Sequence, residues 1–187
     1  MVHVASSPAL RLAAAAAGLA AAALATGCSS SGSPGTGASS SQAAPVTMKL
    51  TSSAFKNNGT IPKVYTCDGK GINVPLSWSG APKGTAWFAV TVIDPSGPVT
   101  HWYVIDIPAT TTGIKQGVSY TNSTPGKQVS SWLGMCPGGG PDSYQFTIYA
   151  MPSSYKPLQT YAGYAEDEEG LAAHAIGIGQ LTGYYAD

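Results

Sequence analysis

The sequence predicts a mainly β fold: an antiparallel β-sandwich with Greek-key connections, one C-terminal helix and short helical turns. Short runs of β-branched and aromatic residues recur from residue 48 onward, separated by clusters of glycine, proline and asparagine. Prolines stand in the same region at positions 62, 75, 82, 95, 98, 108, 125 and 137. Many short strands broken by turns are typical of a sandwich, whereas a parallel sheet requires a helix between successive strands.

The predicted strands differ in how deeply we expect them to be buried. They comprise residues 48–52, 76–78, 85–93, 100–105 and 144–150. In 85–93 apolar residues occupy both alternating positions, which indicates a strand buried on both faces. In 144–150 the apolar residues alternate with Gln145, Thr147 and Tyr149, which predicts that one face of this strand is less buried.

One segment near the C-terminus has helical character. The acidic run 166–169 precedes the apolar, Ala-rich segment 170–181. Acidic residues favour the first turn of a helix because they face the positive end of its dipole. We therefore expect one C-terminal helix beside the sandwich, although Gly177 and Gly179 lower its intrinsic stability.

Residues 1–28 have the three parts of an export signal: a basic residue, Arg11, then an apolar run, then small residues. Cys28 follows Leu-Ala-Thr-Gly, which resembles a bacterial lipobox, although Leu24 stands one place further upstream than usual. We predict that Cys28 carries a lipid and anchors the protein to the extracytoplasmic face of the cell membrane. The alternative is an ordinary secretory signal with a cysteine near the cleavage site, and it also predicts export.

Residues 29–46 are Ser, Gly, Ala, Pro and Thr apart from Gln42 and Val46, and they carry no charge, so we expect a flexible linker. The remaining segment, 47–187, is about 140 residues long, the usual size of one domain. The formal net charge is zero and no basic stripe is present, which argues against a nucleic-acid partner.

The chain contains three cysteines, and assigning Cys28 to lipid leaves Cys67 and Cys136. An oxidising compartment allows these two to pair, and we predict that disulfide. The alternative is that both are buried free thiols.

The densest group of residues that could take part in binding or catalysis is the segment Asp94–Trp102. An acid ends the most apolar strand, prolines stiffen the turn, and a histidine opens the next strand. This rigid connection predicts that Asp94 and His101 lie close together. Each has an ordinary structural alternative, a turn-capping carboxylate for Asp94 and a satisfied strand-end histidine for His101. We also expect Trp132 to form a pocket wall.

The segment Asp94-Pro-Ser-Gly-Pro98 with His101-Trp102 resembles the signature of the phosphatidylethanolamine-binding protein family, in its bacterial Raf-kinase-inhibitor-like branch. Other landmarks agree in order and spacing, so the resemblance extends from about residue 50 to residue 183. They are Ser53-Ala-Phe55, Ile61-Pro62, Tyr65-Thr-Cys67-Asp-Gly69, Pro75-Leu76-Ser-Trp78, Cys136-Pro137, Tyr144-Gln-Phe146-Thr-Ile-Tyr149-Ala and Leu181-Thr-Gly183.

The resemblance implies an antiparallel β-sandwich with a pocket at one end for phosphate-like anions or phosphorylethanolamine head groups. By position, Asp94, Pro98 and His101 match its first pocket segment and Tyr144 its second. The family usually has a His-Arg pair before that tyrosine, where this chain has Asp142-Ser143. A second carboxylate beside Asp94 repels phosphate. The pocket is therefore expected to prefer a cationic or neutral ligand, or to bind anions weakly.

We interpret the chain as an envelope-anchored module that binds a small anionic or zwitterionic ligand at Asp94, Pro98, His101, Tyr144, Asp142 and Trp132, without a cofactor and without catalysis. No Gly-x-Ser-x-Gly nucleophile motif is present. A protein target is a further expectation, since the resemblance includes inhibitors. Two alternatives stay open: a hydrolase or metal-assisted enzyme that uses Asp94, His101 and Asp142, and an interaction protein with a vestigial pocket.

Overall fold

The computed structural model describes residues 43–97, 99–118, 126–157 and 164–187. The predicted signal with Cys28, nearly all of the predicted linker, and Pro98 lie outside these residues. No helix in the described part of the chain is both long enough and apolar enough to cross a membrane.

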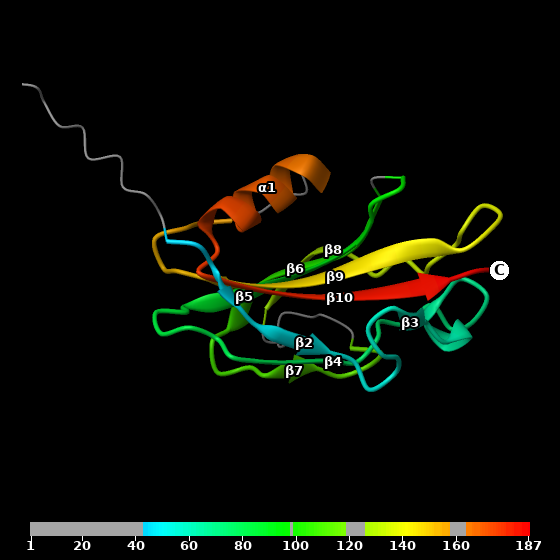
Figure 1. Ribbon diagram of the computed structural model, residues 1–187, viewed down its shortest axis with the longest axis horizontal. Coiled ribbons are helices and arrows are strands. Elements are labelled where there is room, and N and C mark those ends of the chain that lie inside the picture. The colour runs from blue at the N-terminus through cyan, green and yellow to red at the C-terminus, as the bar shows by residue number, and fades with distance from the viewer. Residues whose placement is uncertain (1–42, 98, 119–125, 158–163) are drawn as a thin grey trace, which may run out of the picture. The chain divides into compact units, whose positions relative to one another are not determined.

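The described chain forms two β-sheets and one α-helix (Figure 1). The seven-stranded sheet has the order β1 (Val46–Thr47), β10 (Gly177–Tyr185), β9 (Asp142–Met151), β5 (Trp87–Asp94), β6 (Val99–Pro108) and β8 (Lys127–Ser130), and β3 (Gly59–Thr60) also pairs with β10. The three-stranded sheet has the order β2 (Lys49–Thr51), β4 (Leu76–Ser79) and β7 (Gly113–Ile114). The helices are the 3₁₀ turn η1 (Lys63–Tyr65) and α1 (Tyr164–His174).

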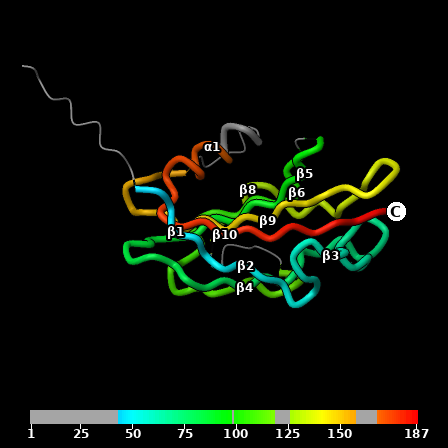
Figure 2. The backbone as a smooth tube through the Cα atoms, viewed as in Figure 1, coloured from blue at the N-terminus to red at the C-terminus, as the bar shows by residue number. Residues whose placement is uncertain are grey.

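All predicted strands are confirmed, but the large sheet is mixed instead of antiparallel throughout. The pairs β10–β9, β9–β5 and β5–β6 are antiparallel, whereas β1 and β3 pair with β10 in parallel. Figure 2 shows these two short segments lying along the outer side of β10. They cover backbone groups that β10 would otherwise expose at the edge of the sheet.

The large sheet has a hydrophobic core on each face. Phe88, Val90 and Val92 of β5 join the core shared with the three-stranded sheet, while Trp87 and Ala89 join the core shared with α1. The prediction that this strand is buried on both faces is confirmed.

The prediction that one face of residues 144–150 is less buried is wrong for most of the strand. Thr147 and Tyr149 are buried, and Tyr149 belongs to the core that includes Leu171 of α1. The helix covers this face, and the local sequence of β9 carries no information about it.

The C-terminal helix is confirmed for residues 164–174, but the expectation that it continues to 181 is wrong, because 177–185 is strand β10. Buried and less buried residues alternate along β10 with a period of two. Its glycines allow close packing: a Cβ on Gly179 would lie 2.8 Å from the Met48 carbonyl oxygen, and one on Gly183 would lie 2.6 Å from Ile61 Cγ1. These glycines therefore serve packing between layers, and not the end of a helix.

In the structure Cys67 and Cys136 form a disulfide, with their Cα atoms 5.6 Å apart and a sequence separation of 69. Thr66 and Met135 form a β-bridge beside it, and the Cys67 amide donates to the Met135 carbonyl at 3.2 Å. The bond therefore ties two loops that are distant in sequence.

Candidate functional site

Because side chains alternate along a strand, several polar side chains lie at one end of the large sheet, on the face toward the three-stranded sheet. On β5, Asp94 follows Val90 and Val92 in the alternation that faces the core between the sheets. On β9, Asp142 and Tyr144 hold the same parity as the core residue Phe146. Because β5 and β9 are antiparallel neighbours, with Ile93 opposite Gln145, the end of one strand lies beside the start of the other.

His101 reaches this group through a β-bulge. In the pairing of β5 with β6, Val92 lies opposite Trp102 and Ile93 opposite Thr100, which leaves His101 as the extra residue. A bulge re-aims a side chain that regular alternation would place on the opposite face. The His101 ring accordingly contacts the Tyr144 ring edge to face, with centroids 5.1 Å apart and an interplanar angle of 86°.

The hydrogen bonds of His101 fix its tautomer. Its Nδ1 lies 2.9 Å from the Leu133 carbonyl oxygen, which can only accept, so Nδ1 carries the proton and donates. The Leu133 amide donates to the His101 carbonyl at 2.7 Å. Burial lowers the pKa of His101, and the Leu133 bond and the Asp94 carboxylate oppose this in part. At neutral pH Nε2 is therefore a lone-pair acceptor, and no described residue donates a hydrogen bond to it.

Asp94 combines a structural role with a free oxygen. Its Oδ1 accepts hydrogen bonds from the Ser96 amide at 2.8 Å and the Ser96 hydroxyl at 2.6 Å. Asp94 therefore caps the turn, as the structural alternative expected. Its Oδ2 has no hydrogen-bond partner among the described residues. The side chain is 8% exposed, and its charge acts on His101 and Tyr144.

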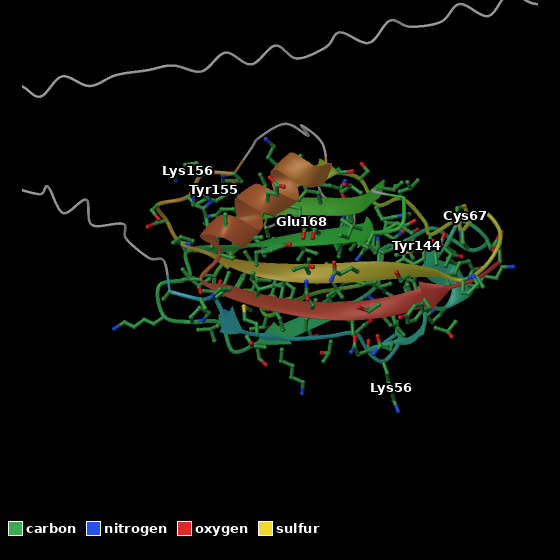
Figure 3. All side chains as sticks on the ribbon, turned by 45° about the horizontal axis from the view of Figure 1, so that its top comes forward. Lys56, Cys67, Tyr144, Tyr155, Lys156 and Glu168 are labelled. Atoms are coloured by element: carbon green, nitrogen blue, oxygen red, sulfur yellow. A yellow bond between two sulfur atoms is a disulfide. The ribbon has the colours of Figure 1, made fainter. Side chains whose placement is uncertain are left out.

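Tyr144 is the most deeply buried member of the group, at 1% exposed. Burial, followed by the charges of Asp142, Asp94 and Asp187, raises the pKa of Tyr144 to about 12. The phenol thus stays protonated at neutral pH and can donate. Its hydroxyl has no hydrogen-bond partner in the described part of the chain. Figure 3 shows Tyr144 near the end of the sheet, with the disulfide residue Cys67 drawn toward the same end.

Three residues near Tyr144 were missed by sequence reasoning: Tyr185, Asp187 and Asp68. Tyr185 pairs with Asp142 in the sheet, and its hydroxyl donates to Asp68 Oδ2 at 2.5 Å. That bond is the main reason why the pKa of Tyr185 is raised. Tyr185 was missed because 177–181 was assigned to a helix, and the alternation of Leu181, Gly183 and Tyr185 was the signal that could have found it. Asp68 lies in a loop far away in sequence, and no local pattern places it beside Tyr185.

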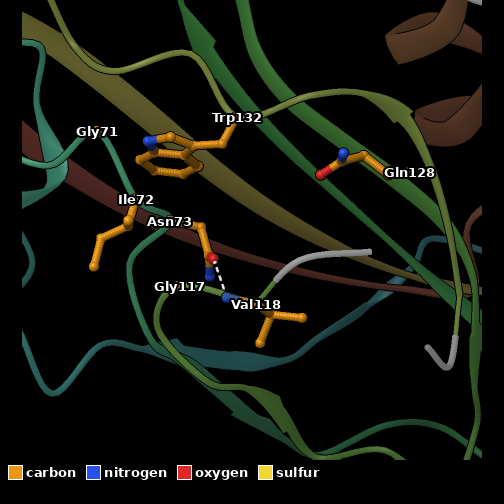
Figure 4. A pocket seen from close by; sticks show the side chains of 7 residues that line it. All are labelled: Gly71, Ile72, Asn73, Gly117, Val118, Gln128 and Trp132. Atoms are coloured by element: carbon orange, nitrogen blue, oxygen red, sulfur yellow. Dashed lines mark hydrogen bonds between the residues drawn. The ribbon is translucent and has the colours of Figure 1, made fainter. Parts of the chain in front are cut away.

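Trp132 lines a hollow whose described wall contains none of the other predicted site residues. Figure 4 shows it in the wall of a cavity of about 280 Å³. The described lining is Gly71, Ile72, Asn73, Gly117, Val118, Gln128 and Trp132, without Asp94, His101 or Tyr144. Its indole nitrogen donates to the Tyr65 carbonyl at 3.2 Å, and its ring packs edge to face on Trp102 with centroids 5.6 Å apart. The structure thus brings together Asp94, His101, Asp142 and Tyr144, but not Trp132.

The metal-binding alternative gains no geometric support. In the described ranges, no group of three or more His, Cys, Asp or Glu side chains converges closely enough to hold a metal ion. Asp94, His101 and Asp142 therefore meet as neighbours around Tyr144 and not as a ligand set.

Comparison with known proteins locates this site in a recognised domain, because residues 51–186 match the phosphatidylethanolamine-binding protein family. The chain belongs to this family. A UPF0098 protein of Methanothermobacter thermautotrophicus is 33% identical over 149 residues, which cover 74% of this chain and 98% of the relative. The UPF0098 protein YbcL of Escherichia coli is 32% identical over 167 residues, covering 78% and 90%.

Two solved structures are similar to the phosphatidylethanolamine-binding domain of this chain. The crystal structure of Escherichia coli YbcL, described as a member of the mammalian PEBP family, has a TM-score of 0.65 and 27% identity, covering 75% of this chain and 98% of that one. The structure of CT736, a phosphatidylethanolamine-binding protein homologue of Chlamydia trachomatis, has a TM-score of 0.64 and 26% identity with the same coverage. The family match includes Asp94, His101, Asp142 and Tyr144, so the candidate site lies inside the family domain.

Proposed function

We propose that this member of the phosphatidylethanolamine-binding protein family is an envelope-anchored binding module that holds a small head-group-like ligand between Asp94, His101, Asp142 and Tyr144. The two sheets would form the β-sandwich with Greek-key connections that carries the pocket. Cys28 would supply the membrane anchor, as its lipobox-like context predicts.

One observation carries the proposal. Two polar side chains that are at least nine-tenths buried, His101 and Tyr144, meet at one end of a sheet, and each has a polar atom without a partner among the described residues. Neither atom is among the fully buried side-chain atoms without a partner, which are Trp78 Nε1, Thr91 Oγ1 and Thr147 Oγ1 in the described residues. Free polar atoms that are not sealed in the core support a site whose partner is a ligand.

Binding without conversion fits the contacts better than catalysis. The Ser96 hydroxyl donates to Asp94, so in this group it does not form a nucleophile pair with His101. The pKa of His101 is lowered by burial and its Nδ1 bonds a backbone carbonyl, so the carboxylate that orients the base in a hydrolytic triad has no counterpart here.

A thermal-shift titration of the full chain with phosphorylethanolamine, ethanolamine and inorganic phosphate tests the proposal. We expect at least one ligand to raise the Tm, since a ligand that binds only the folded state stabilises it. His101→Gln and Tyr144→Phe should remove that shift, and His174→Gln, which changes an exposed histidine on α1, should retain it. A shift of equal size in His101→Gln and Tyr144→Phe would contradict the proposed site.

A further inference from the structure

We infer that the proposed site at Asp94, His101, Asp142 and Tyr144 selects small organic cations with N–H donors, such as a primary alkylammonium, and discriminates against phosphate. The inference rests on the proposed function above and specifies the ligand class of that same site. Four sets of observations lead to it: the charges around the pocket, the free atoms inside it, the cations of the chain, and the fixed neighbours of its carboxylates.

The charges that act on the pocket are negative. Asp142, Asp94 and Asp187 all act on the Tyr144 hydroxyl, and Asp94 is the charge that acts on His101. Asp68 lies next to this group through its bond to Tyr185. A further anion would enter this field at an energetic cost, whereas a cation within about 4–6 Å of a carboxylate is stabilised.

The free atoms of the buried side chains are mostly acceptors. His101 Nε2 has a lone pair because Nδ1 is committed to Leu133, and Asp94 keeps Oδ2 after Oδ1 has bonded Ser96. Tyr144 adds one hydroxyl, which can donate or accept. Two acceptors and one hydroxyl suit an ammonium group with N–H donors and offer a phosphate dianion a single donor.

The folded part of the chain contains lysines but no arginine. The arginine of the chain is Arg11, in the predicted export signal, so residues 43–187 contain no guanidinium. Arginine is the residue that binds phosphate through two parallel hydrogen bonds. The position where the resembling family usually has His-Arg is occupied by Asp142-Ser143, and Asp142 is the half-buried carboxylate nearest the start of β9.

The Asp68–Tyr185 bond keeps one of these carboxylates out of direct ligand contact. Tyr185 donates to Asp68, and Asp142 lies opposite Tyr185 in the sheet. Asp94 and Asp142, which lie on the two strands that meet at the site, are the carboxylates that we assign to ligand contact, with Asp68 and Asp187 adding to the field. Removing either contact carboxylate should weaken cation binding, and removing Asp142 should also relieve the repulsion of anions.

Calorimetric titration of the full chain at pH 7.5 with ethylammonium, tetramethylammonium and inorganic phosphate tests the inference. We expect ethylammonium to bind, tetramethylammonium to bind at least several-fold more weakly because it has no N–H group, and phosphate to bind more weakly still. Asp94→Asn and Asp142→Asn should each weaken ethylammonium binding about tenfold, as loss of a charge-assisted bond of ~1.5 kcal/mol does. Asp142→Asn should strengthen phosphate binding.

Asp106→Asn is the matched control. Asp106 is an exposed carboxylate on β6 with φ of 54°, a conformation that Asn also tolerates, so this variant removes the same charge outside the site. It should bind ethylammonium as the unchanged chain does. If Asp106→Asn weakened ethylammonium binding as much as Asp94→Asn and Asp142→Asn do, general surface charge would explain the weakening, and the inference would be overturned.

Two further outcomes separate this inference from the proposed function. Phosphate binding that is lost in His101→Gln, without ethylammonium binding, would overturn the inference and leave the binding-module proposal standing. Absence of any His101-dependent binding of ethylammonium, phosphate and phosphorylethanolamine would overturn both.

Discussion

Strand β9 carries two buried tyrosines on opposite faces of one sheet, and their surroundings differ. Tyr149, on the face covered by α1, donates its hydroxyl to the carboxyl group of Glu168. Tyr144, near the start of the same strand, lies close to three carboxylates and bonds none of the described ones. Figure 3 shows Glu168 on the helix above the sheet and Tyr144 toward the sheet's end.

The two tyrosines differ in whether another residue of the described chain satisfies the hydroxyl group. Where two buried polar groups satisfy each other, as Tyr149 and Glu168 do, they hold a helix on a sheet. Where buried side chains lie together and keep polar atoms that no described residue bonds, as His101 and Tyr144 do, our proposal is that a ligand supplies the partner. The following predictions test this distinction, from the largest expected effect to the smallest.

The disulfide should contribute most to the stability of the end of the molecule that holds Tyr144. The pair of changes Cys67→Ala and Cys136→Ala should lower the free energy of unfolding by about 4 kcal/mol, because the bond closes a loop of 69 positions. Chemical denaturation with and without reductant measures it. Reductant should destabilise the unchanged chain and leave the double variant unaffected; an equal response of the two would contradict the bond's contribution.

Glu168 should make the stability of the fold decline as pH rises from about 4.5 to about 7. Burial raises the pKa of Glu168 from 4.5 to about 7, with an opposing effect from the Thr91 hydroxyl. The folded state therefore holds this proton more tightly than the unfolded state, so stability is greatest below about pH 4.5 and falls as pH rises through 7. The total loss corresponds to about 3 kcal/mol.

Denaturation of Glu168→Gln between pH 5 and pH 8 measures this effect, since the neutral amide should flatten the slope. Glu169→Gln, a change at the exposed neighbour, is the control and should keep it. If the stability of Glu168→Gln declined with pH as much as that of the unchanged chain, Glu168 would not be the cause of the decline.

Removal of the Tyr149 hydroxyl should lower the stability of the fold more than removal of the Tyr144 hydroxyl. Tyr149→Phe should destabilise the fold by about 1–3 kcal/mol, because the partly buried carboxyl of Glu168 loses its donor. Tyr144→Phe should change stability by less than about 0.5 kcal/mol, since its hydroxyl has no described partner to lose. Denaturation of both variants in parallel decides this, and equal losses would erase the distinction between the two faces.

His101 should give a pH dependence of opposite sign to that of Glu168. Because burial lowers the pKa of His101 below its ordinary 6.5, the unfolded state takes up this proton first, and stability falls as pH drops below 6.5. His101→Gln should remove this acid-side decline, and His174→Gln should not. Denaturation midpoints between pH 4.5 and pH 7 provide the readout, and an unchanged acid limb in His101→Gln would contradict the assignment.

The sequence anticipated the strands better than their environment. The apolar run 85–93 and the alternating run 144–150 were found because hydrophobic periodicity is local. Burial of Tyr149 was missed because α1 covers it from a distant part of the chain. Strand β10 was missed because the acidic run 166–169 before an apolar segment predicted a helix, and only the tight approach of Met48 and Ile61 shows why the glycines of this strand are there.

For the site, the rigid turn between Asp94 and His101 correctly indicated their proximity, since the Asp94 charge acts on the His101 ring. The bulge that aims His101 at Tyr144 could not be predicted, because it depends on the register between β5 and β6. Trp132 was predicted as a pocket wall, and the hollow that it lines has none of Asp94, His101 and Tyr144 in its described wall.

The most direct test of the binding site is the NMR spectrum of the histidine side chains during titration of the full chain with ethylammonium. His101 Nε2 should shift with saturable dependence on ligand, and the Tyr144 ring signals should shift with the same midpoint, while His174 on α1 should not respond. Saturable shifts at His174 with none at His101 would contradict the account, as would an unchanged spectrum.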